Sequence, residues 1–347
     1  MMKLKFILSS GFLSLALFAL SQEQVHFSQF ETTPLDINPA LAGVFRGDIR
    51  FNSSVRQQWA SITDMYQTLY GSVDFPVAKN IIQDDFFALG ISFINDMAGK
   101  TLFTTNQGYL TLAYSKSLSP KDDNYFSLGF QGGWAQRSIS SSGINFENQW
   151  TGTAFDNNLP NGELTLNETS SYFDMNSGIH WFFSPNDKFK SSIGLSMSHL
   201  HNPDVNFLGL REKLYRKFSI HGICDIFIEK HKLSLLPKFY FMQQGKNRII
   251  LLGNDINFHL KGRSEITNYL HDLSIAIGTY YRFADALAPH LSMKWAGFTL
   301  DFSYDLTLSH LKDYNSGIGG PEISLTYRAG LSIGKHDRAK HSEVMFF

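Results

Sequence analysis

Large apolar residues occupy every second position along many stretches of this 347-residue chain. From Phe298 to Asp305, the residues Phe, Leu, Phe and Tyr alternate with Thr, Asp, Ser and Asp. From Ile193 to Ser198, the residues Ile, Leu and Met alternate with Gly, Ser and Ser. Because successive side chains of a strand point to opposite faces, each stretch predicts a β-strand with one bulky apolar face and one small or polar face.

The polar faces of these strands carry charged side chains. Asp255, Asn257 and His259 share one face of a predicted strand, and Asp301 and Asp305 share a face of another. A single strand of a soluble β-sandwich could show the same alternation. A continuous bulky face opposite a charged face is best explained by lipid outside and a wet lumen inside. We therefore predict an all-β fold, a transmembrane antiparallel up-and-down β-barrel.

The alternating stretches predict about fourteen strands in a barrel that spans residues 48–334. Most are long enough to cross a bilayer, which takes about 9–11 residues of a tilted strand. The number is even, as in single-chain bacterial barrels, and small shifts in the boundaries leave twelve or sixteen strands as alternatives. The predicted strands cover residues 48–58, 65–74, 85–95, 104–118, 123–138, 172–183, 188–200, 214–228, 231–243, 247–260, 269–282, 287–295, 297–307 and 321–334.

The connections between these strands divide into short and long ones. The short ones include residues 184–187, 229–230 and 296–297, and the long ones are 139–171, 201–213 and 308–320. Outer-membrane barrels have short periplasmic turns and long extracellular loops. We therefore expect the two groups at opposite ends of the barrel, with the N-terminus of the barrel on the periplasmic side.

The first 21 residues predict export. Met1–Lys5 contains two lysines, and Phe6–Leu20 is an apolar run of fifteen residues that ends beside small residues suited to cleavage after Ser21. This is the layout of a Sec signal peptide. The alternative is a membrane-anchoring helix, but a helix needs about 20 residues to span a bilayer. We therefore assign residues 1–21 as a signal peptide and expect the mature chain in the outer membrane.

Composition and motifs give no candidate for catalysis, a metal or a cofactor. The 30 Lys and Arg balance 31 Asp and Glu, so no basic excess exists for nucleic acid. The single cysteine, Cys224, excludes an intramolecular disulfide framework and a zinc site built from cysteines. His199 and His201 lack a third ligand at suitable spacing, and we interpret them as a polar pair at a strand end. No G-x-S-x-G or H-E-x-x-H motif is present.

Charged residues of both signs are predicted to face the lumen. Selective pores usually carry a ring of one sign, so mixed signs favour an ion-paired interior that binds or holds a plug. By alternation, the inward charges are Arg50, Arg56, Arg137, Asp174, Lys238, Asp255, Lys294, Asp301, Asp305 and Arg328.

Several short motifs occur in a specific order along the chain. They include Phe27-Ser28-Gln29-Phe30, then Asn38-Pro39-Ala40 with Gly43, then Arg56 with Trp59, Asp96 with Gly99, and Tyr281-Arg282 with Asp285. Together they resemble the PorP/SprF family, outer-membrane proteins of the type IX secretion system in Bacteroidota. The resemblance extends from residue 26 to about residue 330.

The resemblance implies a non-enzymatic barrel associated with protein secretion and gliding motility. It implies two kinds of partner, namely periplasmic ring and peptidoglycan-binding components, and the C-terminal domains of secreted cargo such as cell-surface adhesins. A diffusion porin or small-molecule transporter remains an alternative, as does an outer-membrane enzyme. Residues 22–47 are expected to form a periplasmic or plug-like segment, or else an ordinary leader to the first strand. Residues 335–347 are expected to form a polar periplasmic tail.

Overall fold

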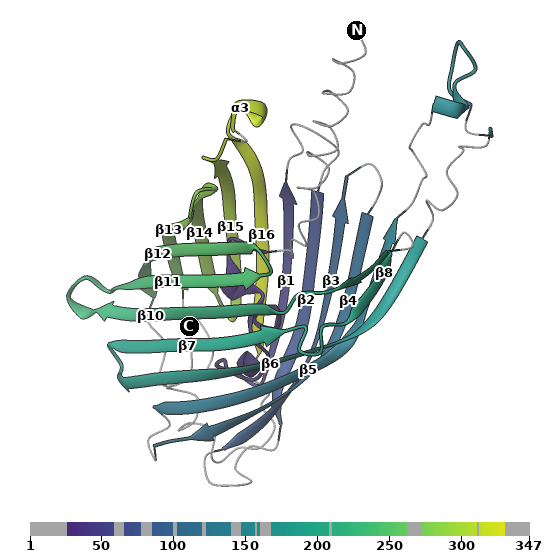
Figure 1. Ribbon diagram of the computed structural model, residues 1–347. Helices are drawn as coiled ribbons and strands as arrows, with labels where there is room; N and C mark the ends of the chain where they lie inside the picture. Colours follow the sequence, from purple (N-terminus) through teal and green to yellow (C-terminus); the bar gives the residue numbers. More distant parts are fainter. Residues whose placement is uncertain are drawn as a thin grey trace.

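Fourteen antiparallel strands form a closed barrel in which every strand pairs with its neighbours along the chain (Figure 1). The computed structural model describes residues 26–58, 66–77, 85–99, 103–119, 123–139, 147–156, 158–159, 168–207, 210–261, 273–310 and 312–329. The predicted signal peptide, Trp59 and the predicted tail at 335–347 lie outside these residues. The predicted barrel and its fourteen strands are confirmed.

Each strand predicted from the sequence corresponds to one strand of the barrel. The strands are β1 (Ile49–Gln58), β2 (Tyr66–Val77), β3 (Phe86–Ala98), β4 (Phe103–Ser117), β5 (Asn124–Ile139), β6 (Glu168–Asn186), β7 (Phe189–Ser198), β10 (Lys217–Ile228), β11 (Leu233–Gln244), β12 (Asn247–Lys261), β13 (Leu273–Arg282), β14 (Ala286–Trp295), β15 (Phe298–Thr307) and β16 (Ile318–Ala329). A separate hairpin of β8 (Asp204–Phe207) and β9 (Leu210–Lys213) lies within the predicted loop 201–213.

Alternation along the strands separates the two faces of the wall. On β15, Phe302 is 44% exposed on the outside, whereas the next residue, Ser303, is fully buried inside. Leu110 on β4 and Phe130 on β5 are likewise exposed on the outside. Exposed bulky apolar side chains suit hydrocarbon, and closure of the sheet leaves no unpaired strand edge facing lipid.

The three long loops and the three short turns named from the sequence lie at opposite ends of the barrel. The β14–β15 turn is Ala296-Gly297, and both residues have positive φ, which is the conformation of a tight hairpin turn. We call this the tight-turn end. The opposite, long-loop end carries the β5–β6 connection and the short helix α3 (Lys312–Asn315) (Figure 1). The other connections do not follow this division: the short ones at residues 99–102, 245–246 and 283–285 lie at the long-loop end, and the eleven-residue connection between β12 and β13 lies at the tight-turn end. Among the described residues, no helix is long and apolar enough to cross a membrane.

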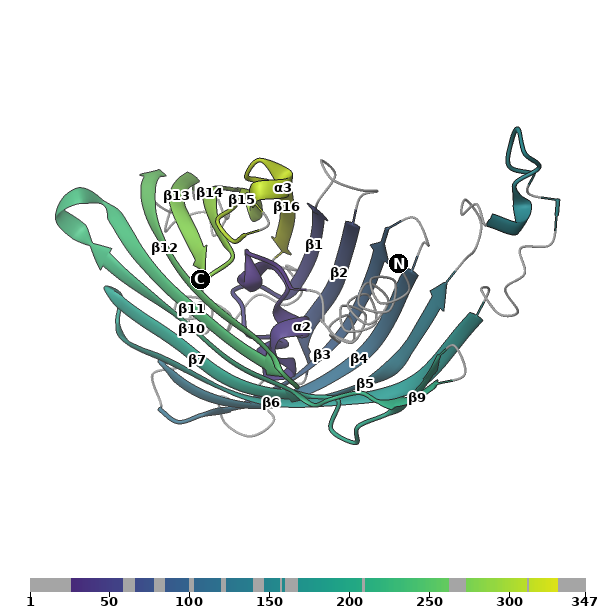
Figure 2. The same ribbon diagram turned by 45° about the horizontal axis from the view of Figure 1, so that its top comes forward.

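Residues 26–48, which precede β1, lie inside the barrel (Figure 2). They form three short helices, η1 (Phe30–Thr32), α2 (Pro34–Ile37) and η2 (Pro39–Leu41). His26 contacts Arg56 near the long-loop end, whereas the backbone N–H of Asp48 donates to the Ala329 carbonyl at the tight-turn end. We call residues 26–48 the plug segment, because it runs through the lumen from one end to the other.

Candidate functional site

The first turn of the plug segment is held by a carboxylate of the last strand. The backbone N–H groups of Ser28 and Gln29 both donate to the Glu322 carboxylate, each at 2.9 Å. The Gln29 side-chain amide donates to the Ser303 hydroxyl at 2.8 Å. All four residues are buried. Hydrogen bonds from backbone N–H groups to a carboxylate are stronger than those between neutral groups. This contact therefore fixes the part of the plug segment nearest the long-loop end.

Four buried charges surround this contact. Arg56 lies 2.6 Å from Asp305 and 3.4 Å from Glu322, and Arg282 lies 2.7 Å from Asp305. Both guanidinium groups donate to the Ser28 hydroxyl, at 3.2 and 3.0 Å, and that hydroxyl donates to Asp305 at 2.8 Å. Desolvated charges are tolerated only when they are paired and hydrogen-bonded. The charges of the wall are therefore arranged around a residue of the plug segment.

A second buried cluster holds η1. Glu31 accepts hydrogen bonds from the ammonium of Lys238 and the hydroxyl of Tyr280. Lys238 also lies 2.5 Å from Asp255, so its ammonium group forms ion pairs with two carboxylates. The preceding ring of the plug segment, Phe30, stacks on Tyr240 with ring centroids 5.4 Å apart and planes 16° apart. The segment therefore presents a carboxylate and a ring to matching groups on the wall.

The turn that begins at Asn38 rests on glycines of three adjacent strands. Gly129 on β5 and Gly178 on β6 are register partners, and Gly194 lies on β7. A Cβ added at Gly178 or Gly194 would collide with the Asn38 side chain, and one at Gly129 would collide with the backbone of Ala40. We call these three residues the glycine seat. Only glycine at these positions leaves room for the Asn38 side chain and the Ala40 backbone to lie this close to the sheet.

Asn38 joins the plug segment to the strands of the seat. Its amide nitrogen donates to the carbonyls of Ile179 and Leu195, at 2.9 and 3.2 Å, and lies 3.2 Å from Nε2 of His221. Its side-chain oxygen accepts the backbone N–H of Ala40 at 2.9 Å and so caps η2. One side chain thereby fixes the local turn and connects it to three strands.

Asp74 fixes the part of the plug segment nearest the tight-turn end. This carboxylate accepts the backbone N–H of Gly43 at 2.8 Å and two hydrogen bonds from Arg50, at 2.9 and 2.8 Å. Arg50 also donates to the Leu41 carbonyl at 3.0 Å and covers the ring of Phe45 at 4.7 Å. Gly43 has a positive φ of 72°, a conformation that favours glycine.

The other inward charges lie along the lumen wall. Asp174 accepts hydrogen bonds from Tyr109 and His199, each at 2.8 Å, and Nε2 of His290 lies 3.5 Å from Asp301. Arg137 covers the ring of Tyr172. Lys294 and Arg328 are half-buried near the tight-turn end.

His199 and His201 do not share a strand face. β7 ends at Ser198, and His199 has a positive φ of 59° and a buried side chain. His201 is exposed and contacts the ring of Phe173. The strand extended to residue 200 in our prediction, and the early end of β7 explains the difference.

Some residues of the sequence motifs lie away from the plug segment. Tyr281 is exposed on the outer face, Asp285 lies in the β13–β14 turn, and Gly99 follows β3 with a positive φ. Asp96 accepts a hydrogen bond from Thr68 at 2.7 Å. The structure therefore brings the motif at 27–30 together with Arg56 and Arg282, whereas the motif at 38–43 contacts other strands of the wall.

Sequence reasoning missed several residues that hold the plug segment. Glu31, Asp74 and Glu322 were not among the predicted lumen charges, although alternation places Asp74 and Glu322 on inward positions of β2 and β16. The glycine seat was missed as well. Its signal was an isolated glycine at an inward position within each of three consecutive strands, which often marks a close backbone approach.

Solved structures with a similar fold are barrels of low sequence identity. The toluene transporter TodX of Pseudomonas putida has a TM-score of 0.47 and 8% identity, with 85% of this chain and 92% of that chain covered. The CymD monoaromatic hydrocarbon channel has a TM-score of 0.47 and 9% identity, with 87% and 94% covered. BamA from Haemophilus ducreyi has a TM-score of 0.41 and 11% identity, with 82% and 70% covered.

No curated protein matches this chain. A family model described as the type IX secretion system membrane protein PorP/SprF matches residues 19–327. This range includes the whole plug segment and nearly all of the barrel. The chain therefore belongs to the PorP/SprF family of type IX secretion system membrane proteins.

Proposed function

We propose that this protein is a non-enzymatic outer-membrane component of the type IX secretion system that presents docking surfaces at its two ends. The long-loop end receives and anchors secreted cargo, and the tight-turn end contacts the periplasmic machinery. The observation that carries the proposal is the plug segment, which occupies the lumen and contacts strands on opposite sides of it. A barrel filled by its own chain acts through its ends.

The plug segment inside the lumen argues against a diffusion porin. Glu322 holds the plug segment near the long-loop end, Lys238 and the glycine seat hold its middle, and Asp74 holds it near the tight-turn end. Displacing it would leave buried charges unpaired, and breaking a buried pair typically costs about 3–5 kcal/mol. The segment therefore belongs to the folded core of the barrel. Planar-bilayer recordings that show a large, steadily open conductance would favour the porin instead.

Exposed apolar residues at the long-loop end support protein docking there. Phe283 in the β13–β14 turn is 64% exposed, and Tyr314 on α3 is 80% exposed. The two connections contact each other, because the backbone N–H groups of Leu308 and Ser309 donate to the Asp285 carbonyl at 2.7 and 3.0 Å. Exposed aromatic residues on connected loops are typical anchors of protein interfaces.

The tight-turn end offers a second connected surface. The β6–β7 turn and the β10–β11 turn are joined by an exposed ion pair in which Lys188 lies 2.7 Å from Glu229. Residues 118–119 and 123, which flank the β4–β5 connection, lie at the same end. Short turns that contact one another form a stable, polar face, which suits contact with periplasmic ring and peptidoglycan-binding components.

The proposal is tested by deleting the gene, restoring variants and measuring proteins at the cell surface and in the medium. The double variant Phe283→Ser/Tyr314→Ser is expected to release cargo from the surface into the medium, while the barrel remains folded. Lys230→Ser, an exposed change at the opposite end, is the control and should retain cargo like the wild type. A deletion strain without redundant copies and with unchanged surface proteins would contradict the proposal.

A further inference from the structure

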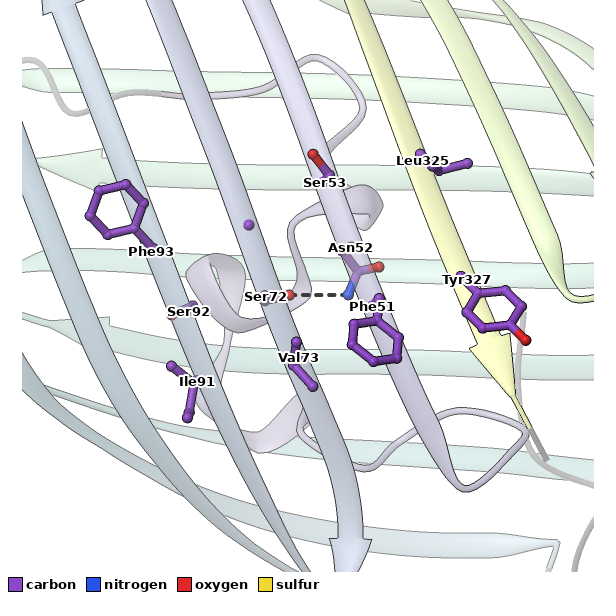
Figure 3. A pocket seen from close by; sticks show the side chains of 11 residues that line it. Phe51, Asn52, Ser53, Ser72, Val73, Ile91, Ser92, Phe93, Leu325 and Tyr327 are labelled. Carbon is purple, nitrogen blue, oxygen red and sulfur yellow. Dashed lines mark hydrogen bonds between the residues drawn. The ribbon is translucent and has the colours of Figure 1, made fainter. Parts of the chain in front are cut away.

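A groove of about 610 Å³ lies on the outer wall where the first and last strands meet (Figure 3). Its rim is apolar and comes from four neighbouring strands. Phe51 on β1, Val73 on β2 and Ile91 on β3 lie side by side along one edge, and Phe93 and Leu325 lie further along the wall. Tyr327 on β16 completes the rim and stacks on Phe51 with ring centroids 6.3 Å apart.

The groove exists because two small residues lie side by side in a wall of large ones. Ser53 and Gly71 are register partners on β1 and β2. In the same row, Ser53 pairs with Leu325 on one side and Gly71 pairs with Phe93 on the other. A Cβ added at Gly71 would meet no atom within 4 Å. The wall is therefore hollowed at this row, and the missing side chain of Gly71 has open space in front of it.

The polar side chains beneath the groove form hydrogen bonds with one another on the lumen side of the wall. Asn52 donates from its side-chain amide to the Ser72 hydroxyl at 3.1 Å and accepts from Thr326 at 3.0 Å. These side chains are buried on the lumen side of the wall. The groove thus offers apolar contact without a charged group to hold a lipid headgroup, and its occupant must be apolar.

The position of the groove identifies that occupant. It is continuous with the exposed apolar surface that faces the bilayer, so the hydrocarbon of the membrane extends directly into it. Phe51 is close to the start of β1, and Tyr327 is close to the end of β16, which places the groove in the half of the wall toward the tight-turn end. With the tight-turn end on the periplasmic side, on which the proposed function also rests, we propose that this groove binds one acyl chain of a phospholipid from the periplasmic leaflet of the membrane.

The geometry provides a matched pair of variants. The Cβ of Gly71→Leu would meet no atom within 4 Å, and we expect the rest of the leucine side chain to occupy the groove. Gly108 on β4 is a second glycine at an outward position, a Cβ there would also meet no atom within 4 Å, and it does not line the groove. Gly108→Leu therefore adds the same side chain to the same kind of surface. Gly71 and Gly108 pair with Phe93 from opposite sides, and only Gly71 lies on the groove side, so a difference between the two variants reports on the groove side of Phe93.

The experiment uses the full-length protein in vesicles of phosphatidylethanolamine and phosphatidylglycerol that contain a phospholipid with a photoactivatable diazirine in one acyl chain. After illumination, labelled peptides are measured by mass spectrometry. We expect peptides of β1, β2 and β16 around the groove to be labelled at least threefold more than other outward strands. Gly71→Leu should reduce that labelling to the level of the other strands, and Gly108→Leu should leave it unchanged.

Two results would overturn the proposal. Uniform labelling around the wall, with no response to Gly71→Leu, would show that the groove holds no lipid chain in preference to the rest of the surface. A crosslink between groove residues of two protein copies, with little lipid label, would show that a second copy covers the groove instead. Both variants should keep the mobility of the folded barrel on a semi-native gel, which confirms that the comparison is made on folded protein.

Discussion

Arg56 and Glu322 are register partners across the seam that closes the barrel, and their side chains lie 3.4 Å apart. Arg56 belongs to the first strand and Glu322 to the last. Since the same carboxylate accepts the first backbone N–H groups of the plug segment, closure of the sheet and docking of the plug segment share one group. Stability of the seam and occupancy of the lumen are therefore coupled.

Replacement of that carboxylate should destabilise the barrel. Glu322→Gln keeps the shape of the side chain but leaves Arg56 with one carboxylate fewer in a buried site. Since Arg56 keeps Asp305 as a partner, we expect a loss of about 1–3 kcal/mol, the usual cost of leaving a buried donor without its acceptor, measured by urea unfolding in lipid vesicles. Glu229→Gln, which removes an exposed pair with Lys188, is the control and should leave the unfolding curve unchanged. Equal unfolding of both variants would disprove the coupling.

The glycine seat should not tolerate a side chain. Gly178→Ala would drive a Cβ into Asn38, and overpacking of this kind typically costs about 1–3 kcal/mol. The expected result is a lower unfolding temperature on a heat-modifiability gel. Gly108→Ala adds the same methyl group where it would meet no atom within 4 Å and should behave like the wild type. A Gly178→Ala protein as stable as the control would contradict close docking of the Asn38 turn.

The plug segment should be covalently trappable inside the barrel. The hydroxyls of Thr32 and Ser54 lie 3.1 Å apart, so Thr32→Cys/Ser54→Cys brings two thiols within disulfide reach. In a Cys224→Ser background, we expect a disulfide to form in cells, because the periplasm is oxidising, and peptide mass mapping detects it. Thr32→Cys/Ser53→Cys is the control, since Ser53 faces the outside. Absence of the first crosslink would place the segment elsewhere.

An acidic residue at the tight-turn end should give the barrel an acid-sensitive component of stability. Burial alone would raise the pKa of Asp85, but hydrogen bonds from Tyr114 and Ser117 and the charge of Lys116 outweigh it, and the pKa is lowered overall. A carboxyl with a lowered pKa stabilises the fold above its unfolded pKa of about 3.9 and loses that effect as the pH falls through the folded value.

Asp85→Asn measures this component. The variant should be less stable than the wild type by a constant amount above about pH 5, and the difference should shrink as the pH falls below about 4. Urea unfolding at several pH values provides the comparison. A difference that is independent of pH down to the acid limit would show that the contacts of Asp85, and not its charge, stabilise the turn.

The barrel was predictable because a strand can be recognised from the alternation of its own residues. Alternation from Phe298 to Asp305 depends only on adjacent residues, and it repeats in most strands. The plug contacts depend on residues far apart in the chain, such as Gln29 and Glu322, which are separated by 293 positions. Local pattern carries no information on such pairs. The extra hairpin β8–β9 was missed for a related reason, since strands of four residues are too short to show a period.

The path of the plug segment has a consequence for assembly. The segment leads directly into β1 at Ile49, and β1 closes against β16 at the opposite end of the chain. If the sheet closed first, residues 26–48 would have to pass through a finished ring to reach their seat. We therefore expect the plug segment to lie against β5, β6 and β7 already when the first and last strands meet. Contacts this distant in sequence form slowly. We therefore expect the pairing of the first and last strands to limit the rate at which the barrel folds into the membrane.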